Sequence, residues 1–185
     1  MLNQNEQTLQ EIARLRGQVE LLANQIATAE KHQKDYYTDL DARLRKLEPR
    51  QETIDGQAAQ VMPSEKTAYD AAFAQVKSGD YKGGAAAMQE FVRRYPESAY
   101  AANAQYWLGN AYFAQGDYKN AIGALEVVAT TYKDSVKAPD ALLNIASAQA
   151  DLNDNAAARR TLEELIGKYP QSEAATKARQ RLGQR

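Results

Sequence analysis

Two regular patterns of apolar and polar positions divide the chain, and the first occupies its N-terminal part. One position recurs every seven residues from Asn5 to Leu47, and a second position follows three residues after it. Most residues at the two positions are apolar, and such a pattern sustained over several heptads indicates a coiled coil. We therefore predict a coiled-coil oligomerisation domain over residues 1–48, whose function is to join copies of the chain. Its predicted seam consists of Ile12, Leu15, Val19, Leu22, Ile26, Tyr36, Leu40 and Leu47.

The composition of this seam bears on how many copies associate. β-Branched residues at the first position with leucine at the second favour two strands, and this combination occurs at Ile12, Leu15, Val19, Leu22 and Ile26. Polar Asn5 and Gln33 lower stability in exchange for a defined register, and they are compatible with other oligomer numbers. The alternative is one long helix folded back on the rest of the chain, although packing a single helix does not require a two-position seam.

A longer pattern begins after residue 63, where the sequence repeats with a period of 37 residues. The matching columns include Asp80, Asp117 and Asp154; Tyr95, Tyr132 and Tyr169; and Ser98, Ser135 and Ser172. A fixed period of this size indicates a repeat architecture. Within each unit, apolar residues at helical spacing flank a turn, so each unit is expected to be a helical hairpin that buries its apolar face against a neighbour.

The repeat columns also predict where helices begin and end. We expect helices near 64–78, 81–94, 99–115, 118–131, 136–151, 155–168 and 173–183, with the three aspartates as N-caps. Ser64 is the cap candidate for the first of these helices. Residues 49–63 are polar and contain Gly56 between two prolines, which predicts a linker with residual helix through Ile54 and Val61. No strand is expected anywhere in the chain.

The middle unit resembles a tetratricopeptide repeat (TPR). The residues that match the TPR motif are Leu108, Gly109, Tyr112, Gly116, Asp117, Tyr118, Ala121 and Leu125, whereas Gln105 stands where the motif has tryptophan. The resemblance implies an all-α fold, with the N-terminal coiled-coil helix followed by a TPR superhelix of three 37-residue repeats plus a capping helix. The TPR domain would occupy residues 64–185.

The composition contains little that suggests catalysis. The chain has no cysteine, so a thiol nucleophile or a cysteine-linked lipid anchor is excluded for these residues, and its one histidine, His32, lies on the flank of the coiled coil. No set of residues resembles a nucleophile with its base or a ligand cluster. The net charge of −1 does not favour nucleic acid, and no apolar run is long enough for membrane insertion. We predict a protein that is not an enzyme and has no cofactor, catalytic residue or metal ligand.

Binding is the remaining function, and a TPR stack predicts where binding occurs. The first helices of successive hairpins line a concave surface. Aromatic and amide side chains in these helices suit an extended or helical peptide, and the predicted groove residues are Tyr69, Phe73, Asn103, Tyr106, Asn110, Phe113, Leu143 and Asn144. For some of these residues, ordinary packing between repeats is the alternative.

A second pattern in the same columns concerns a carboxylate. Some TPR domains grip the terminal carboxylate of a partner with two asparagines and several basic residues. The residues in matching columns form a candidate carboxylate clamp of Asn110, Asn144, Lys177 and Arg181. The first basic residue of that pattern is replaced by Tyr106, which argues against a complete clamp.

The combination of a heptad helix, a polar segment and repeats joined by Tyr-Pro-x-Ser is more specific than any of its parts. The stretch from Arg94 through Tyr95-Pro96-Glu97-Ser98 to Leu108-Gly109 resembles the YbgF/CpoB family of Tol–Pal-associated periplasmic TPR proteins, the cell division coordinators. The resemblance implies a periplasmic protein whose signal peptide has been removed, whose coiled coil forms a homotrimer and whose repeats bind TolA. It further implies that the protein coordinates peptidoglycan synthesis by a bifunctional penicillin-binding protein with outer-membrane constriction during cell division.

The composition of the seam favours a dimer, whereas the family resemblance implies a trimer. We follow the resemblance, so that a trimer is favoured and a dimer remains possible. Other functions stay open. An outer-membrane protein assembly TPR protein of the BamD kind has similar repeats but no heptad helix. A direct activator of a peptidoglycan synthase is another alternative, and a cytosolic co-chaperone is a further one.

Overall fold

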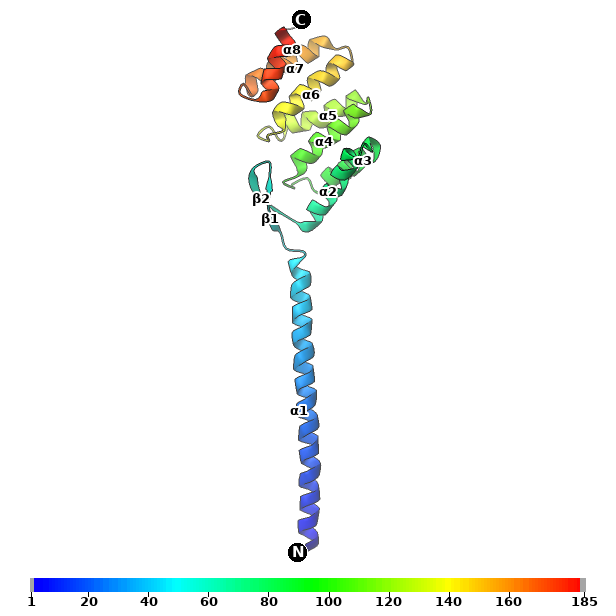
Figure 1. Cartoon of the computed structure of the whole chain (residues 1–185), viewed down its shortest axis with the longest axis vertical. Coiled ribbons are helices and arrows are strands. Elements are labelled where there is room, and N and C mark those ends of the chain that lie inside the picture. The colour runs from blue at the N-terminus through cyan, green and yellow to red at the C-terminus, as the bar shows by residue number, and fades with distance from the viewer. Residues whose placement is uncertain (1, 184–185) are drawn as a thin grey trace. The chain divides into compact units, whose positions relative to one another are not determined.

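The computed structural model describes residues 2–183, and side chains from residue 3 onward. The chain divides into two compact units, Met1–Glu48 and Pro49–Arg185. The first unit consists of helix α1 (Leu2–Arg45), which runs without interruption (Figure 1). The helix ends just before Glu48-Pro49, since proline disfavours helical conformation in the residue before it. The predicted long N-terminal helix is therefore confirmed.

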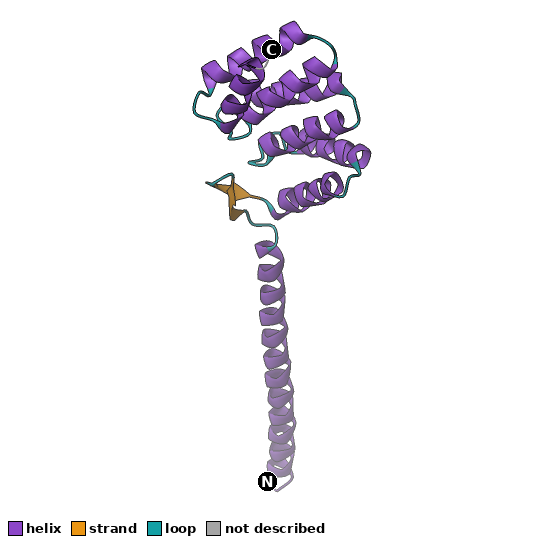
Figure 2. Ribbon diagram, turned by 45° about the horizontal axis from the view of Figure 1, so that its top comes forward, coloured by secondary structure: helices purple, strands orange, loops and turns teal. Residues whose placement is uncertain are grey.

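The second unit begins with a β-hairpin rather than a linker. Strands β1 (Arg50–Ile54) and β2 (Gln57–Val61) pair antiparallel, with Arg50 opposite Val61 and Ile54 opposite Gln57 (Figure 2). Asp55 and Gly56 form the turn, and both have positive φ, 52° and 82°. The prediction of residual helix in residues 49–63, and of a chain without strands, is wrong here. An Asp-Gly pair is a strong hairpin signal, because a two-residue turn of this type needs positive φ at both positions.

The rest of the second unit is an array of antiparallel helices. These are α2 (Pro63–Lys77), α3 (Tyr81–Arg94), α4 (Ala101–Ala114), α5 (Tyr118–Thr130), α6 (Ala138–Asp151), α7 (Asn155–Lys168) and α8 (Glu173–Gly183). Each helix packs on the next one along the chain, and α2, α4, α6 and α8 also meet one another in succession. The predicted helices are confirmed to within two residues at each end.

The helix starts follow the repeat columns. Oδ1 of Asp80, Asp117 and Asp154 accepts a bond from the backbone N–H three residues later, at 2.9, 3.3 and 2.9 Å. These N-caps are confirmed. The expectation for Ser64 is wrong, because α2 begins at Pro63 with Met62 as N-cap and no side-chain cap bond. Proline suits the first helical position, where its missing N–H would have no partner within the helix.

Two apolar clusters hold the repeats together. One lies between β2 and α2–α5 and is centred on Val61, Met88, Phe91 and Leu108. The other lies between α5–α8 and is centred on Leu125, Val128, Ile145 and Leu165. Because each cluster draws on several successive helices, no hairpin buries its apolar face alone.

Candidate functional site

Five polar side chains on α4, α6 and α8 form two neighbouring hydrogen-bonded groups. Nδ2 of Asn144 donates to Oδ1 of Asn110 at 2.8 Å and to the hydroxyl of Tyr106 at 3.4 Å. One turn further along α6, the hydroxyl of Ser147 accepts from Nη1 of Arg181 at 2.8 Å. All five residues keep exposed surface. We call this set, Tyr106, Asn110, Asn144, Ser147 and Arg181, the polar row.

The polar row leads into a hollow at the C-terminal end of the repeats. This hollow has a volume of about 690 Å³ and lies between α6, α7 and α8. Leu162 and Leu182 supply apolar wall, while Arg159, Arg181 and Asp151 supply charge. Its size falls in the range of roughly 300–1,000 Å³ that is typical of ligand pockets. A mixed lining of this kind suits part of a peptide.

The four residues of the candidate carboxylate clamp are only partly brought together. Asn110 and Asn144 are hydrogen-bonded to each other, whereas Arg181 bonds to Ser147, one turn further along α6. Lys177 is exposed and makes no hydrogen bond or ion pair with the described part of the chain. Tyr106 stands in place of the first basic residue of the pattern and carries no positive charge. The clamp therefore stays a prediction whose strongest elements are the two asparagines and Arg181.

Three predicted groove residues are not open to a partner. Tyr69 is 8% exposed and its ring stacks on Tyr100 at 4.4 Å between centroids, because it belongs to the first apolar cluster. Leu143 is 6% exposed and belongs to the second cluster. Asn103, also 6% exposed, donates from Nδ2 to Oδ2 of Asp55 at 2.7 Å. The expectation that these three line an open groove is wrong.

The burial of Tyr69 has an electrostatic consequence. Burial raises the pKa of its phenol well above the ordinary value, and the nearby carboxylate of Asp55 raises it further. The neutral phenol is therefore the form that the folded repeats accommodate.

Two further aromatic residues of the predicted groove remain half-buried. The ring centroid of Phe73 lies 4.9 Å from that of Trp107, and Nζ of Lys77 lies 5.7 Å from the Phe73 ring centroid. Phe113 contacts Tyr118 edge-on at 5.3 Å. Both keep surface that a partner can contact, so their role in the groove stays a prediction.

The hairpin adds residues that sequence reasoning missed. Besides accepting from Asn103, the carboxylate of Asp55 lies 3.6 Å from Nζ of Lys137, which precedes α6. The same Nζ lies 5.9 Å from the ring centroid of Tyr106. The Asp-Gly signal in the sequence could have revealed the turn, but nothing local indicated that Asp55 would contact residues so far along the chain.

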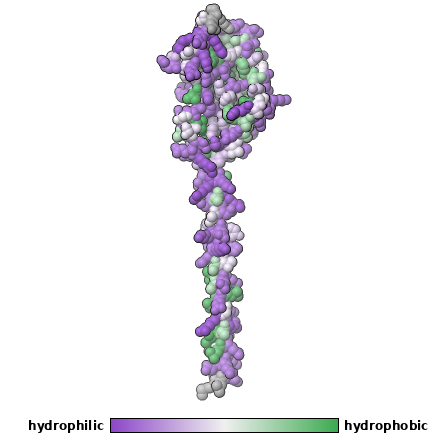
Figure 3. All heavy atoms as spheres, viewed as in Figure 1, coloured by the Kyte–Doolittle hydropathy of each residue, from purple (hydrophilic) through white to green (hydrophobic). Residues whose placement is uncertain are grey.

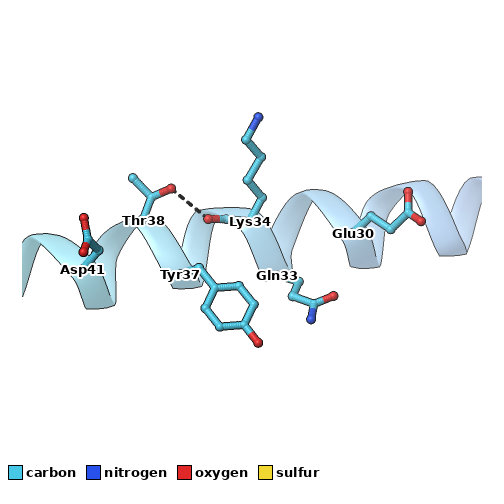
Figure 4. Close-up of a pocket in the computed structure, with 6 residues that line it drawn as sticks. All are labelled: Glu30, Gln33, Lys34, Tyr37, Thr38 and Asp41. Carbon is cyan, nitrogen blue, oxygen red and sulfur yellow. Dashed lines mark hydrogen bonds between the residues drawn. The ribbon is translucent and has the colours of Figure 1, made fainter.

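Helix α1 presents the predicted oligomerisation seam as bare apolar surface. Every seam residue is exposed, from 41% at Ile12 to 73% at Tyr36, and Figure 3 shows apolar residues distributed along this helix. The shallow hollow in Figure 4 is formed by α1 alone, with Gln33 and Tyr37 on one side and Lys34 and Thr38 on the other. Exposed apolar residues in such number indicate a surface that another copy covers.

Features of other functional classes are missing from residues 2–183. Within that range there is no group of three or more His, Asp or Glu residues that could hold a metal ion. Nor does it include a helix long and apolar enough to cross a membrane.

The fold and the groove define a class: a tetratricopeptide-type helical repeat protein with an N-terminal oligomerisation helix. Residues 62–184 match the YfiO family, described as outer membrane lipoprotein, and residues 1–53 match the family described as TolA binding protein trimerisation. The chain belongs to the YfiO family and is a homologue of the cell division coordinator CpoB. CpoB of Pseudomonas putida is 30% identical over 60% of this chain and 51% of its own length. The chain thus spans about half the length of the curated relatives it matches.

Solved structures confirm the repeat fold. The N-terminal domain of stress-induced protein-1 from C. elegans superposes with a TM-score of 0.55 at 13% identity, covering 63% of this chain and 93% of that one. The Yersinia enterocolitica type III secretion chaperone SycD, in complex with a peptide of the translocator YopD, gives a TM-score of 0.54 at 20% identity. That match covers 65% of this chain and 88% of SycD. At such identities the likeness concerns the fold alone.

Proposed function

We propose that this chain is a periplasmic, non-enzymatic scaffold that binds TolA through its TPR groove and associates into a trimer through α1. The match of residues 1–53 to the TolA-binding-protein trimerisation family supports both partners, TolA and a second and third copy. Its homology to CpoB supports a role in cell division and a periplasmic location. The same homology supports the further proposal that the chain coordinates peptidoglycan synthesis with outer-membrane constriction.

The observation that carries the groove assignment is the polar row. This row extends over three alternate helices, α4, α6 and α8, and leads into the hollow beside α8; its side chains are those of Tyr106, Asn110, Asn144, Ser147 and Arg181. Amide and guanidinium groups in such a row can bond the backbone and carboxylates of a peptide. A rigid stack that presents these groups together holds them in position before a partner arrives, which lowers the cost of binding.

Calorimetric titration of the full chain with purified TolA tests this proposal. We expect Asn144→Ala and Arg181→Ala each to weaken binding about tenfold, since the loss of a well-placed contact at an interface costs on the order of 1–2 kcal/mol. Arg160→Ala is the charge-matched control, because Arg160 is exposed on α7 and lies outside the polar row. Equal affinities for all three variants and the parent would contradict the groove assignment.

The role in peptidoglycan synthesis needs a separate assay. We expect the chain to change the rate of a bifunctional penicillin-binding protein only when TolA is also present, as a scaffold would. A rate change by the chain alone, without TolA, would instead identify a direct activator of the synthase.

The YfiO match favours a second candidate, an outer-membrane protein assembly role of the BamD kind. Affinity purification of the full chain from a cell envelope separates the two. Recovery of TolA supports the first function, and recovery of outer-membrane assembly proteins without TolA supports the second.

A further inference from the structure

The tip of the β-hairpin is seated against the start of the polar row. Asn103 lies one turn before Tyr106 on the same face of α4, and its buried amide donates to Asp55 at 2.7 Å. Lys137 lies at the start of α6, with Nζ placed between the Asp55 carboxylate, at 3.6 Å, and the Tyr106 ring. The side chains of Asp55 and Lys137 are only 25% and 26% exposed. A carboxylate from the hairpin therefore extends the line of contacts that the polar row begins.

The chemistry of this contact is that of carboxylate recognition. An amide N–H and an ammonium group both point at one carboxylate, and bonds to an ionised acceptor are among the stronger hydrogen bonds in proteins. Asn103 has little access to water in the folded chain, so its amide needs an acceptor, and Asp55 supplies it. Either Asp55 or a carboxylate from another molecule can satisfy it.

The hairpin is built so that its tip can move while its base stays in place. At the base, Val61 is 1% exposed in the apolar cluster, and Glu52 pairs with Lys66 at 3.6 Å. Ile54 and Ala59 also pack against this cluster. At the tip itself, residues 55–58 are exposed, and the Asp55 side chain makes the contacts with Asn103 and Lys137. A two-stranded hairpin is marginally stable by itself. Breaking the Asp55 contacts would thus free the tip without disturbing the repeats.

We propose that the hairpin tip is an internal stand-in ligand, whose Asp55 carboxylate occupies the Asn103–Lys137 site until a carboxylate of a partner peptide displaces it. This inference rests on the proposed function, because the partner is the segment that the groove binds. The tip lowers the apparent affinity for that segment in proportion to the time it occupies the site. The ammonium group of Lys137 pairs first with the Asp55 carboxylate and then with the carboxylate of the partner peptide.

The contact of the Asp55 carboxylate with the Asn103–Lys137 site is tested without a partner, by hydrogen–deuterium exchange on the full chain. Asp55→Asn keeps a residue that tolerates positive φ and removes only the charge. We expect amides of residues 55–58 to exchange at least about fivefold faster in this variant, because the ion pair that holds the tip is gone, while amides at the base keep the exchange rate of the parent. Glu52→Gln is the matched control, since it neutralises a carboxylate of the same hairpin away from the tip. Equal exchange in Asp55→Asn and the parent would overturn the proposal.

Titration with purified TolA then tests the exchange of occupants. We expect Asp55→Asn to bind about fivefold more tightly than the parent, Glu52→Gln to match the parent, and Lys137→Met to bind more weakly. Tighter binding by Lys137→Met would show that the tip is only a steric cover, and would overturn the proposal. If neither the parent nor Asp55→Asn binds TolA, the proposed function fails. The hydrogen–deuterium exchange experiment then decides alone whether Asp55 holds the hairpin tip in place.

Discussion

Glycine at position 109 marks a close approach of α4 and α5. A Cβ added to Gly109 would lie 2.5 Å from Cγ of Leu125 and 3.3 Å from the carbonyl oxygen of Ala121. In α5, by contrast, a Cβ added to Gly123 would meet no atom within 4 Å. The glycine at position 109 is thus a packing requirement, whereas Gly123 has no such neighbour.

This difference yields a paired prediction. We expect Gly109→Ala to lower the free energy of unfolding by about 1–3 kcal/mol, because overpacking outweighs the better helix propensity of alanine. Gly123→Ala should raise the same free energy by about 0.5–1 kcal/mol, since only the propensity changes. Urea unfolding of both variants measures the two effects, and a change of the same sign in both would contradict the packing argument.

The buried phenol of Tyr69 makes stability depend on pH in the alkaline range. Its pKa in the folded chain is raised above the ordinary value of 10.0. The unfolded chain therefore releases the phenol proton first, so the stabilisation is complete below pH 10 and is lost as the pH rises above it. We expect Tyr69→Phe to stay folded to higher pH than the parent, as followed by circular dichroism. Tyr81→Phe, at an exposed tyrosine, should leave the alkaline transition unchanged.

Among the elements, the repeats are tied together by the tyrosine that closes each unit. The hydroxyl of Tyr169 donates to the carbonyl of Lys133 at 2.7 Å, and that of Tyr132 donates to the carbonyl of Pro96 at 3.4 Å. Each bond spans 36 residues, almost one repeat. The recurring tyrosine thus fixes the distance between successive junctions, which accounts for its place in the 37-residue pattern.

Within α1, the exposed apolar residues change phase near Gln33. From Ile12 to Ile26 the seam residues alternate at three and four residues. The same alternation resumes at Tyr37, Leu40, Leu44 and Leu47, where Tyr37 takes the place of the neighbouring seam residue Tyr36. Gln33 and Tyr37 point to the same side of the helix (Figure 4). An extra step of four residues is a stutter, which locally unwinds a coiled coil. In this phase Leu44 enters the seam, and Arg43, paired with Asp39 at 2.8 Å, leaves it.

We therefore expect Leu44→Ser to lower the thermal stability of the assembled helix, because it removes an apolar contact from the seam. Arg43→Ser, the adjacent control, should have a much smaller effect, since Arg43 would lie on the surface. Thermal unfolding at several protein concentrations measures both. A larger loss from Arg43→Ser would favour the uninterrupted heptad register, in which Arg43 occupies the seam.

At the scale of the whole molecule, α1 cannot leave its seam bare in water. Association buries that surface, so light scattering of the full chain should give three times the mass of one chain. A chain that begins at Pro49 should be monomeric and still folded, because the second unit has its own apolar clusters. This starting point keeps the hairpin, whose Val61 belongs to the first cluster. A full chain with the mass of one copy would contradict the trimer.

Sequence determined the features that depend on residues close together along the chain. The helices, the three aspartate caps and the period of the repeats follow from spacings of three, four and 37 residues, which the order of amino acids states directly. The polar row was predicted in part for the same reason, because Tyr106 and Asn110 recur at helical spacing. Even the hairpin had a local signal in Asp55-Gly56.

Only the tertiary structure decided which of these side chains remain open. Tyr69, Asn103 and Leu143 occupy groove columns, yet all three are buried, because helices and a hairpin distant in sequence cover them. Asp55 meets Asn103 and Lys137 across 48 residues or more of intervening chain. Burial and charge pairing at such separations depend on how whole elements stack, and no short stretch of sequence contains that information.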